Sequence, residues 1–315
     1  MKCLHDALEE YVRLRRSLGL QLRWPASALR CFVDFLEHEG ATFITTDLAV
    51  RWATQPAGIQ QATRAARLSM VRRFATWLSV FDPRTQVPPP RLLNARHRRS
   101  MPYIYTDLEI ESLMAQAARL PSAKGLHAQT HVTLIGLLAA TGLRPGEALA
   151  LDVRNVDLKN GILSIQGTKF GKSRFVPLDK TTCEALTHYA QQRDKLIRSP
   201  RTDAFLISEG GLRLVHCTTR RTFAKMSCAI GLRSPAQGRR IGRGPRLHDF
   251  RHTFATRRLI EWYRAGLDVN RELPKLATYL GHVHVAYTYW YIQSVPELLH
   301  LATERCAARH AGGRR

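Results

Sequence analysis

The stretch Leu247-His248-Asp249-Phe250-Arg251-His252-Thr253 opens a helix that the sequence predicts from about Arg246 to Tyr263. Its first histidine and its arginine are three residues apart, so both side chains project from one face of that helix. Such a pair often lies on a solvated surface. Here the apolar Phe250, Phe254 and Leu259 predict a buried side next to the pair, which therefore borders a core.

Two other short motifs carry cationic side chains of the same kind. Arg144 follows Gly142, which is expected to end one helix, and precedes Pro145, which is expected to start the next, so it lies on a tight turn. His282 ends the stretch Tyr279-Leu280-Gly281-His282. Two arginines with a histidine can stabilise, without a metal, the charge that a phosphate gains in its transition state. Together the motifs indicate phosphodiester chemistry.

A tyrosine hydroxyl is the natural covalent partner for such a site, and Tyr287, Tyr289 and Tyr291 all follow His282. On one continuous helix His282 and Tyr291, nine residues apart, would face opposite sides. Both can serve one phosphate only if the chain breaks between them, and Gly281 makes such a break plausible. Tyr287 can pack beside Tyr291, one helical turn later, whereas Tyr289 is expected to fill the core. The residues alone leave the choice among the three open.

In this order the motifs resemble those of the tyrosine recombinase (phage integrase) family. The resemblance extends from about Thr106 to about Leu301 and adds a lysine in a β-hairpin. One motif alone would be a weak signal, whereas five in order are a strong one. The matching residues are Arg144 to Glu147 (Arg-x-x-Glu), Lys169, His248 and Arg251 (His-x-x-Arg), Leu280 to His282 (Leu-Gly-His) and Tyr291.

The resemblance implies site-specific recombination of DNA, by strand cleavage and rejoining, without a metal or other cofactor. Arg144 and Arg251 would clamp the two non-bridging oxygens of the scissile phosphate. His248 would accept the proton of the nucleophile or hydrogen-bond the phosphate, and His282 would complete the site. Tyr291 would form a 3′-phosphotyrosine, although the Ile-Gln that follows it departs from the Thr-His common in the family.

Lys169 would protonate the leaving 5′ oxygen, as in the family. Lys172 is its competitor, but motif order places Lys169 first. The carboxylates of Glu147 and Asp249 are expected to orient arginine and histidine side chains rather than bind a metal. The gap between His248 and His282 is longer than usual in the family, which suggests an inserted loop around 265–273.

The expected fold is mainly α with a small antiparallel β-sheet, in an N-terminal four-helix core-binding domain and an integrase-like α+β catalytic domain. We expect a helical domain over 1–82, a basic proline-rich linker over 83–102, the catalytic domain over 103–306 and a loose basic tail over 307–315. Apolar periodicity predicts the first four helices at about 4–18, 26–39, from Thr46, and 60–80. The last of these would bury Ala66, Met70, Phe74 and Trp77.

In the second domain, Thr106-Asp107-Leu108-Glu109 is a capping box before a helix that ends near Leu120. Asn160-Gly161 predicts a hairpin turn, followed by an alternating strand from Ile162. A second strand is expected over 174–178, with Lys169 in the loop between the two. Further helices are predicted at about 128–141, 179–198, 218–230, 246–263, 273–280 and 296–306.

Lysine and arginine outnumber aspartate and glutamate by 48 to 25, and the resulting net charge of +23 indicates a polyanionic partner. Charge alone does not separate DNA from RNA or a membrane surface. The resemblance favours double-stranded DNA, bound by a homotetramer or by an assembly with related recombinases. The cations assigned to DNA binding are Arg64, Arg67, Arg72, Arg73, Arg96, Arg98, Arg99, Lys172 and Arg174.

No apolar run reaches the 18 residues of a membrane span, and the first residues lack a signal-peptide core. We therefore expect a cytoplasmic protein. The resemblance implies a bacterial protein of a mobile element, with the nucleoid as its location when bound. The six cysteines contain no Cys-x-x-Cys pair, so neither a disulfide framework nor a zinc site is indicated.

Two other classes of function compete with this interpretation. His282-Val283-His284 with Tyr287 and Tyr291 spells the His-x-His and paired-tyrosine pattern of metal-dependent rolling-circle nucleases. That pattern leaves the arginines and Lys169 unexplained. A DNA-binding accessory protein could keep the integrase-like fold without cutting, but the intact set of catalytic residue types argues against it.

Overall fold

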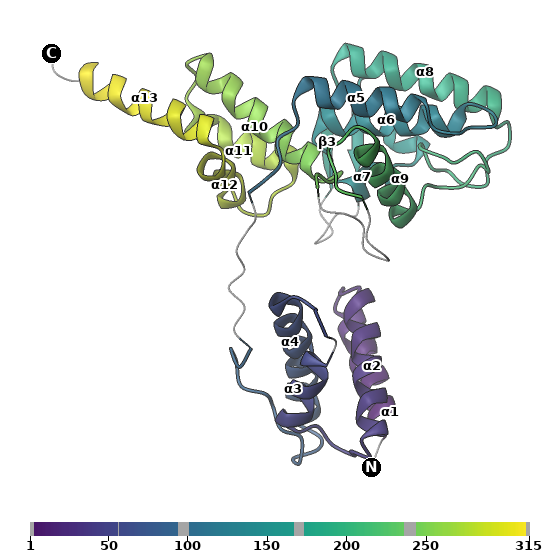
Figure 1. Ribbon diagram of the computed structural model, residues 1–315, viewed down its shortest axis with the longest axis vertical. Helices are drawn as coiled ribbons and strands as arrows, with labels where there is room; N and C mark the ends of the chain where they lie inside the picture. The colour runs from purple at the N-terminus through teal and green to yellow at the C-terminus, as the bar shows by residue number, and fades with distance from the viewer. Residues whose placement is uncertain (1–2, 56, 94–100, 167–172, 236–243, 313–315) are drawn as a thin grey trace. The chain divides into compact units, whose positions relative to one another are not determined.

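The computed structural model describes residues 3–55, 57–93, 101–166, 173–235 and 244–312. The chain divides into two compact units, Met1–Ser100 and Met101–Arg315, and Figure 1 draws the elements of each. Within the described ranges, no helix is long and apolar enough to cross a membrane. The observed elements are mainly helices with one small antiparallel sheet, as the sequence predicted.

The described residues of the first unit form four helices, α1 (Leu4–Ser17), α2 (Arg23–His38), α3 (Thr46–Thr54) and α4 (Gln61–Leu78). Its core is aromatic and aliphatic, with Phe32 and Phe74 fully buried. The side chain of Thr45, one residue before the predicted start, accepts a hydrogen bond from Leu48 N–H and caps α3. Ala66 was predicted to be buried but is exposed. It lies two residues, or about 200° around the helix axis, from the buried Leu68.

The first residues of the predicted linker pack against this helical unit. Gln86 N–H donates to Ile44 O at 2.8 Å. The guanidinium of Arg72 donates to Pro88 O at 2.7 Å and to Pro89 O at 2.6 Å. The helical unit therefore continues beyond residue 82. Residues 94–100, which include Arg96, Arg98 and Arg99, lie outside the described ranges.

The four arginines of α4 are less exposed than expected. Arg64, Arg67 and Arg72 are half-buried and only Arg73 is exposed. The Arg67 guanidinium lies 3.7 Å from the centroid of the Trp52 ring and donates to Trp52 O at 2.8 Å. Burial lowers the pKa of Arg67. Arg67 and Arg72 thus stabilise their own unit.

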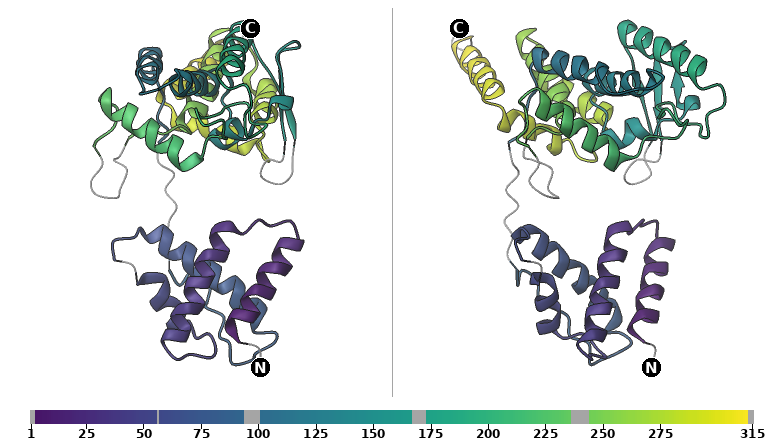
Figure 2. Two further views of the ribbon diagram at one scale, coloured as in Figure 1. Left: turned by 90° about the vertical axis from the view of Figure 1, so that its right-hand side faces the viewer. Right: turned by 45° about the vertical axis from the view of Figure 1, so that its right-hand side comes forward.

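The second unit begins with α5 (Asp107–Ala118), α6 (Leu126–Thr141) and α7 (Pro145–Ala150). The capping box predicted at Thr106 and Glu109 is present. A 3-10 turn (Val153–Asn155) leads into the strands β1 (Val156–Asp157), β2 (Ile162–Ile165) and β3 (Arg174–Pro177), followed by α8 (Lys180–Leu196) and α9 (His216–Ala229). Helix α6 contacts both α5 and α8, and Figure 2 draws the unit from two further directions.

The sheet is antiparallel in the order β1-β2-β3, with Ile162 paired to Pro177 and Ile165 to Arg174. Gly161, with φ of +66°, makes the predicted hairpin turn. Leu163 of β2 and Val176 of β3 face the core. The residues next to them on each strand therefore point to the other face of the sheet. Arg174 is the first residue of β3 and pairs with Ile165, the last residue of β2.

The last part of the unit contains α10 (Asp249–Arg264), α11 (Val269–Leu280), α12 (Ala286–Ser294) and α13 (Pro296–Gly312). His248 is the N-cap of α10 rather than a residue inside it. The predicted inserted loop at 265–273 is wrong, because only a turn at 265–268 separates α10 from α11. The predicted loose tail is also wrong as far as Gly312, since α13 continues to that residue.

Candidate active site

Arg144 sits on the predicted turn. Gly142 ends α6 in the left-handed conformation, with φ of +60°, and Pro145 starts α7 directly after Arg144. The Glu147 carboxylate, one turn into α7, accepts the Arg144 backbone N–H at 3.0 Å and its Nη1 at 2.6 Å. Arg144 Nη2 donates to Gly281 O at 3.2 Å. About a third of the Arg144 side chain, 34%, stays exposed.

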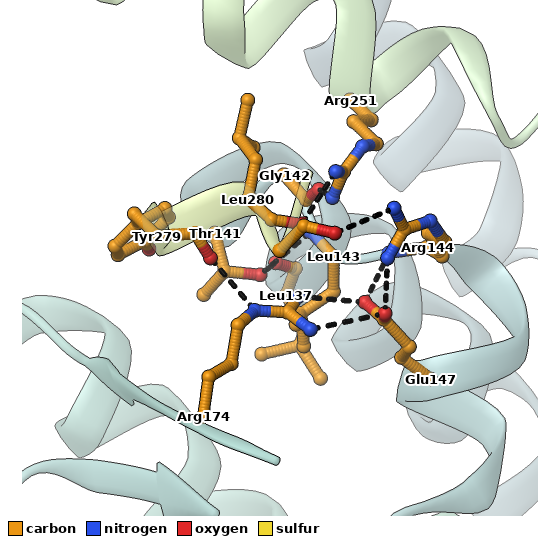
Figure 3. A network of polar contacts seen from close by, with 11 residues as sticks. Leu137, Thr141, Gly142, Leu143, Arg144, Glu147, Arg174, Arg251, Tyr279 and Leu280 are labelled. Atoms are coloured by element: carbon orange, nitrogen blue, oxygen red, sulfur yellow. Dashed lines mark hydrogen bonds and ion pairs between the residues drawn. The ribbon is translucent and has the colours of Figure 1, made fainter. Parts of the chain in front are cut away.

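Arg174 is a third arginine of the cluster, and its side chain is only 10% exposed. It donates to both carboxylate oxygens of Glu147, at 3.1 and 2.8 Å, and its Nε donates to Tyr279 O at 2.7 Å. Figure 3 shows the guanidinium groups of Arg144 and Arg174 converging on this carboxylate. Burial alone would raise the pKa of Glu147, but Arg174 and Arg144 lower it to about 2. The guanidinium of Arg174, predicted to contact DNA, instead donates hydrogen bonds to Glu147 and Tyr279 O inside the protein.

Arg251 is almost completely buried, with 2% of its surface exposed. Its guanidinium donates to Gly142 O at 3.1 Å and to Leu280 O at 2.5 Å, which ties the end of α6 to the end of α11 (Figure 3). Burial and the nearby charge of Arg144 lower its pKa to about 10. Arg251 is therefore still charged at neutral pH, beside other cations whose excess positive charge an anion would relieve.

The carboxylate of Asp249 lies next to an arginine and a histidine, as expected, and these are Arg246 and His252. It accepts the backbone N–H of Arg246 at 2.7 Å, and its Oδ1 lies 3.9 Å from Nε2 of His252. His248 is exposed, and its ring meets that of His252 edge-on at 5.0 Å between centroids. Partial desolvation and the charge of Arg251 lower the pKa of His248.

His282 and Tyr291 are brought together by the break that the sequence predicted. Gly281 ends α11 in the left-handed conformation, with φ of +69°, and α12 begins at Ala286. The Nδ1 of His282 lies 2.8 Å from Oγ1 of Thr288. The His282 ring stacks on the Tyr291 ring, with 6.4 Å between the ring centroids and 18° between the ring planes. Desolvation and then Arg251 lower the pKa of His282 to about 3.

Of the three tyrosines, only Tyr291 is buried, at 3% exposure. It packs in the small core between α10, α11 and α13. Tyr287 and Tyr289 are 45% and 42% exposed, so the prediction that Tyr289 fills the core is wrong. The Tyr289 hydroxyl donates to Asn270 Oδ1 at 3.4 Å instead.

Five of the six predicted catalytic residues therefore meet in one cluster of the second unit. They are Arg144, His248, Arg251, His282 and Tyr291. The sixth, Lys169, lies outside the described residues, as does Lys172.

The sequence did not single out His252, whose Nδ1 lies 3.3 Å from the Tyr291 hydroxyl. Desolvation and then the charge of His248 lower the pKa of His252 to about 4. Its spacing from His248, four residues, was a signal that both share one side of the helix.

Comparison with known proteins places this site in a family. The model of the phage integrase family matches residues 104–297, which contain the whole cluster. A putative integrase/recombinase of Sinorhizobium fredii, y4rB, is 42% identical over 313 residues, 98% of each chain. The chain belongs to the phage integrase family. The prediction of a tyrosine recombinase, an enzyme of site-specific DNA recombination, is confirmed.

Similarity to other recombinases extends over nearly the full chain. The tyrosine recombinase XerC of Mycobacterium bovis is 28% identical over 316 residues, 98% of each chain. The structure of the Tn1549 transposon integrase, solved in complex with transposon right end DNA, matches with a TM-score of 0.66 at 16% identity. That match covers 97% of this chain and 100% of the integrase chain, and it confirms the integrase fold.

Proposed function

We propose that this phage integrase family protein cuts and rejoins double-stranded DNA through a 3′-phosphotyrosine on Tyr291. One observation carries the proposal. The hydroxyl of Tyr291 contacts His252, its ring stacks on His282, and Arg251 interacts with it electrostatically. Tyr291 is thus joined to the arginine and histidine cluster through His252, His282 and Arg251.

The arginines supply the binding site for the scissile phosphate. Arg251 is held by two carbonyls, and Arg144 by Glu147 and Gly281, so both guanidinium groups are fixed before DNA binds. Fixed donors stabilise the charge of a pentacoordinate phosphate without reorganisation during the reaction. Removing one such donor costs about 3 to 4 kcal/mol of transition-state stabilisation.

The reaction needs no external energy source, because one ester bond replaces another. The Tyr291 oxygen bonds to phosphorus and the bond from phosphorus to the 5′ oxygen breaks. A general acid must protonate that oxygen, and we assign this role to Lys169 from the family resemblance. The reverse reaction, with a new 5′ hydroxyl as attacking group, rejoins the strand.

The partner that fits a net charge of +23 is double-stranded DNA, and the Tn1549 integrase structure contains transposon DNA. Four protomers, either of this chain alone or of this chain with related recombinases, would join two duplexes. Tyr291 packs within the unit that carries Arg144 and Arg251, which supports attack in cis. Recombination would then take place on the bacterial nucleoid in the cytoplasm.

The test uses a nicked suicide substrate, end-labelled on either strand end, with and without EDTA. We expect a covalent complex on a 3′ phosphate that survives EDTA in the wild type and in Tyr287→Phe. Tyr291→Phe should lose the complex and keep DNA binding, because only a hydroxyl is removed. A chelator-sensitive 5′ linkage would establish the rolling-circle nuclease instead. Absence of any covalent product would establish the non-cutting accessory protein.

A further inference from the structure

The contact between Tyr291 and His252 crosses from α12 to α10. Nδ1 of His252 lies 3.3 Å from the Tyr291 hydroxyl, with 5.5 Å between the ring centroids. The His252 ring also meets Trp290 edge-on at 5.5 Å, and the side chain is 14% exposed. The imidazole therefore has a defined orientation against the hydroxyl.

The group next to Nε2 decides which of the two ring nitrogens carries the proton, and so whether Nδ1 can accept a hydrogen bond from the tyrosine. Oδ1 of Asp249 lies 3.9 Å from Nε2, and the Asp249 side chain is 3% exposed. A nearby carboxylate favours the tautomer with the proton on Nε2. Nδ1 then carries the lone pair and accepts the hydrogen bond from the hydroxyl of Tyr291. This order of carboxylate, imidazole and hydroxyl is the one that activates oxygen nucleophiles.

Charged and titratable groups surround His252 from both packed helices and from the chain between α11 and α12. On α10 and at its start these are Arg246, His248, Asp249 and Arg251; the opposite side contributes His282 and Tyr291. The cations among them help burial to lower the pKa of His252, so the imidazole is neutral and able to accept a proton at neutral pH. A bound phosphate would offset the positive charge and make His252 more basic, at the moment when substrate is in place.

We propose that His252 is the general base that accepts the proton of Tyr291 during strand cleavage. This inference rests on the proposed function. The Tyr291 oxygen bonds to phosphorus as its proton moves to Nδ1 of His252, and the 5′ oxygen leaves with a proton from the general acid. On rejoining, the Tyr291 oxygen leaves phosphorus and takes the proton back from Nδ1.

This assignment separates the two histidines of the Leu247–Thr253 stretch. His248 is exposed and free to donate to the phosphate, the second of the two roles that the sequence offered for it. His252 contacts the reacting oxygen itself. An ordinary phenol has a pKa near 10, so only about one in a thousand is ionised at pH 7, a deficit of about 4 kcal/mol that a base must help to overcome.

Single-turnover cleavage of the suicide substrate tests the proposal. His252→Asn keeps a side-chain oxygen that can accept the hydrogen bond of Tyr291 but cannot take up a proton. We expect cleavage to fall by about a hundredfold, with DNA affinity and thermal unfolding close to the wild type. The rise of the cleavage rate with pH that titration of a base produces should disappear. His188→Asn, an exposed histidine on α8, controls for the loss of an imidazole.

A fluorinated tyrosine at position 291 separates proton transfer from positioning. Its phenol ionises more easily, so it should restore much of the rate in His252→Asn and change the wild type little. A rate close to the wild type in His252→Asn, or no recovery with fluorotyrosine, would overturn the assignment. If the wild type forms no covalent complex on Tyr291, the proposed function fails first. The two failures are thus distinguishable.

Discussion

At the scale of single residues, Glu147 is the anion on which two of the three arginines of the site depend. It accepts hydrogen bonds from Arg144 and Arg174, and its side chain is 8% exposed. Arg251 lies close enough to repel Arg144. The cluster therefore holds more cations than anions in a partly buried position, which favours a phosphate but costs stability in the free protein.

We predict that Glu147→Gln lowers the free energy of unfolding by about 3 kcal/mol, because it leaves buried guanidinium groups without their shared anion. Urea unfolding measures the change. Sulfate should restore more stability in Glu147→Gln than it adds to the wild type, since it can replace the missing charge. Glu111→Gln, on an exposed position of α5, is the control. Equal stability of both variants would show that Glu147 does not balance the arginines.

At the scale of elements, the site depends on the break between α11 and α12. Gly281 ends α11 with a positive φ, and a Cβ at that position would lie 2.9 Å from Nη1 of Arg174. The same short segment offers Leu280 O to Arg251 and Gly281 O to Arg144. One turn of backbone therefore receives hydrogen bonds from both proposed phosphate-binding arginines.

We predict that Gly281→Ala and Gly266→Ala have similar backbone strain but different effects on cleavage. Both glycines have φ near +70°, and a side chain there costs about 1 to 2 kcal/mol. A Cβ at Gly266 meets no atom within 4 Å, whereas at Gly281 it displaces Arg174. We expect only Gly281→Ala to slow single-turnover cleavage, by about a hundredfold. Equal cleavage rates in the two variants would contradict this role for the break.

At the scale of the whole molecule, stability should fall with acid in two pH ranges. His282 and His252 have pKa values lowered to about 3 and 4, and the unfolded chain has histidine pKa values near 6.5. Below about pH 6.5 the unfolded chain therefore takes up protons that the folded protein does not. The histidine penalty is absent above that pH and grows down to about pH 3 to 4.

The carboxylate range lies lower. The pKa of Glu147 is about 2 when folded and 4.5 otherwise, so its stabilising contribution is present above about pH 4.5 and is lost as the pH falls through 2.

We predict that the unfolding free energy falls between pH 6.5 and 4.5 by at most about 1.4 kcal/mol per pH unit for each histidine. Urea titrations of His282→Asn should show a shallower slope, and those of His188→Asn an unchanged one. The same slope in all three proteins would refute the histidine origin.

Short-range patterns determined much of this protein. The Gly142 to Pro145 turn, the capping box at Thr106 and the hairpin at Gly161 depend on preferences of a few adjacent residues, and each is present as predicted. The break at Gly281 followed from the helical period together with the requirement that His282 and Tyr291 serve one phosphate. The order of the motifs indicated the family, which the comparisons confirm.

Only the tertiary structure decided which partners the side chains have. Arg174 was assigned to DNA from its charge, but packing of β3 against α11 directs it to Glu147 and Tyr279 O. His252 meets Tyr291 across 39 residues of sequence because α10 packs on α12. The physical reason is range: caps and turns depend on neighbouring residues, whereas these contacts depend on how distant helices and strands pack, which no local pattern of the chain encodes.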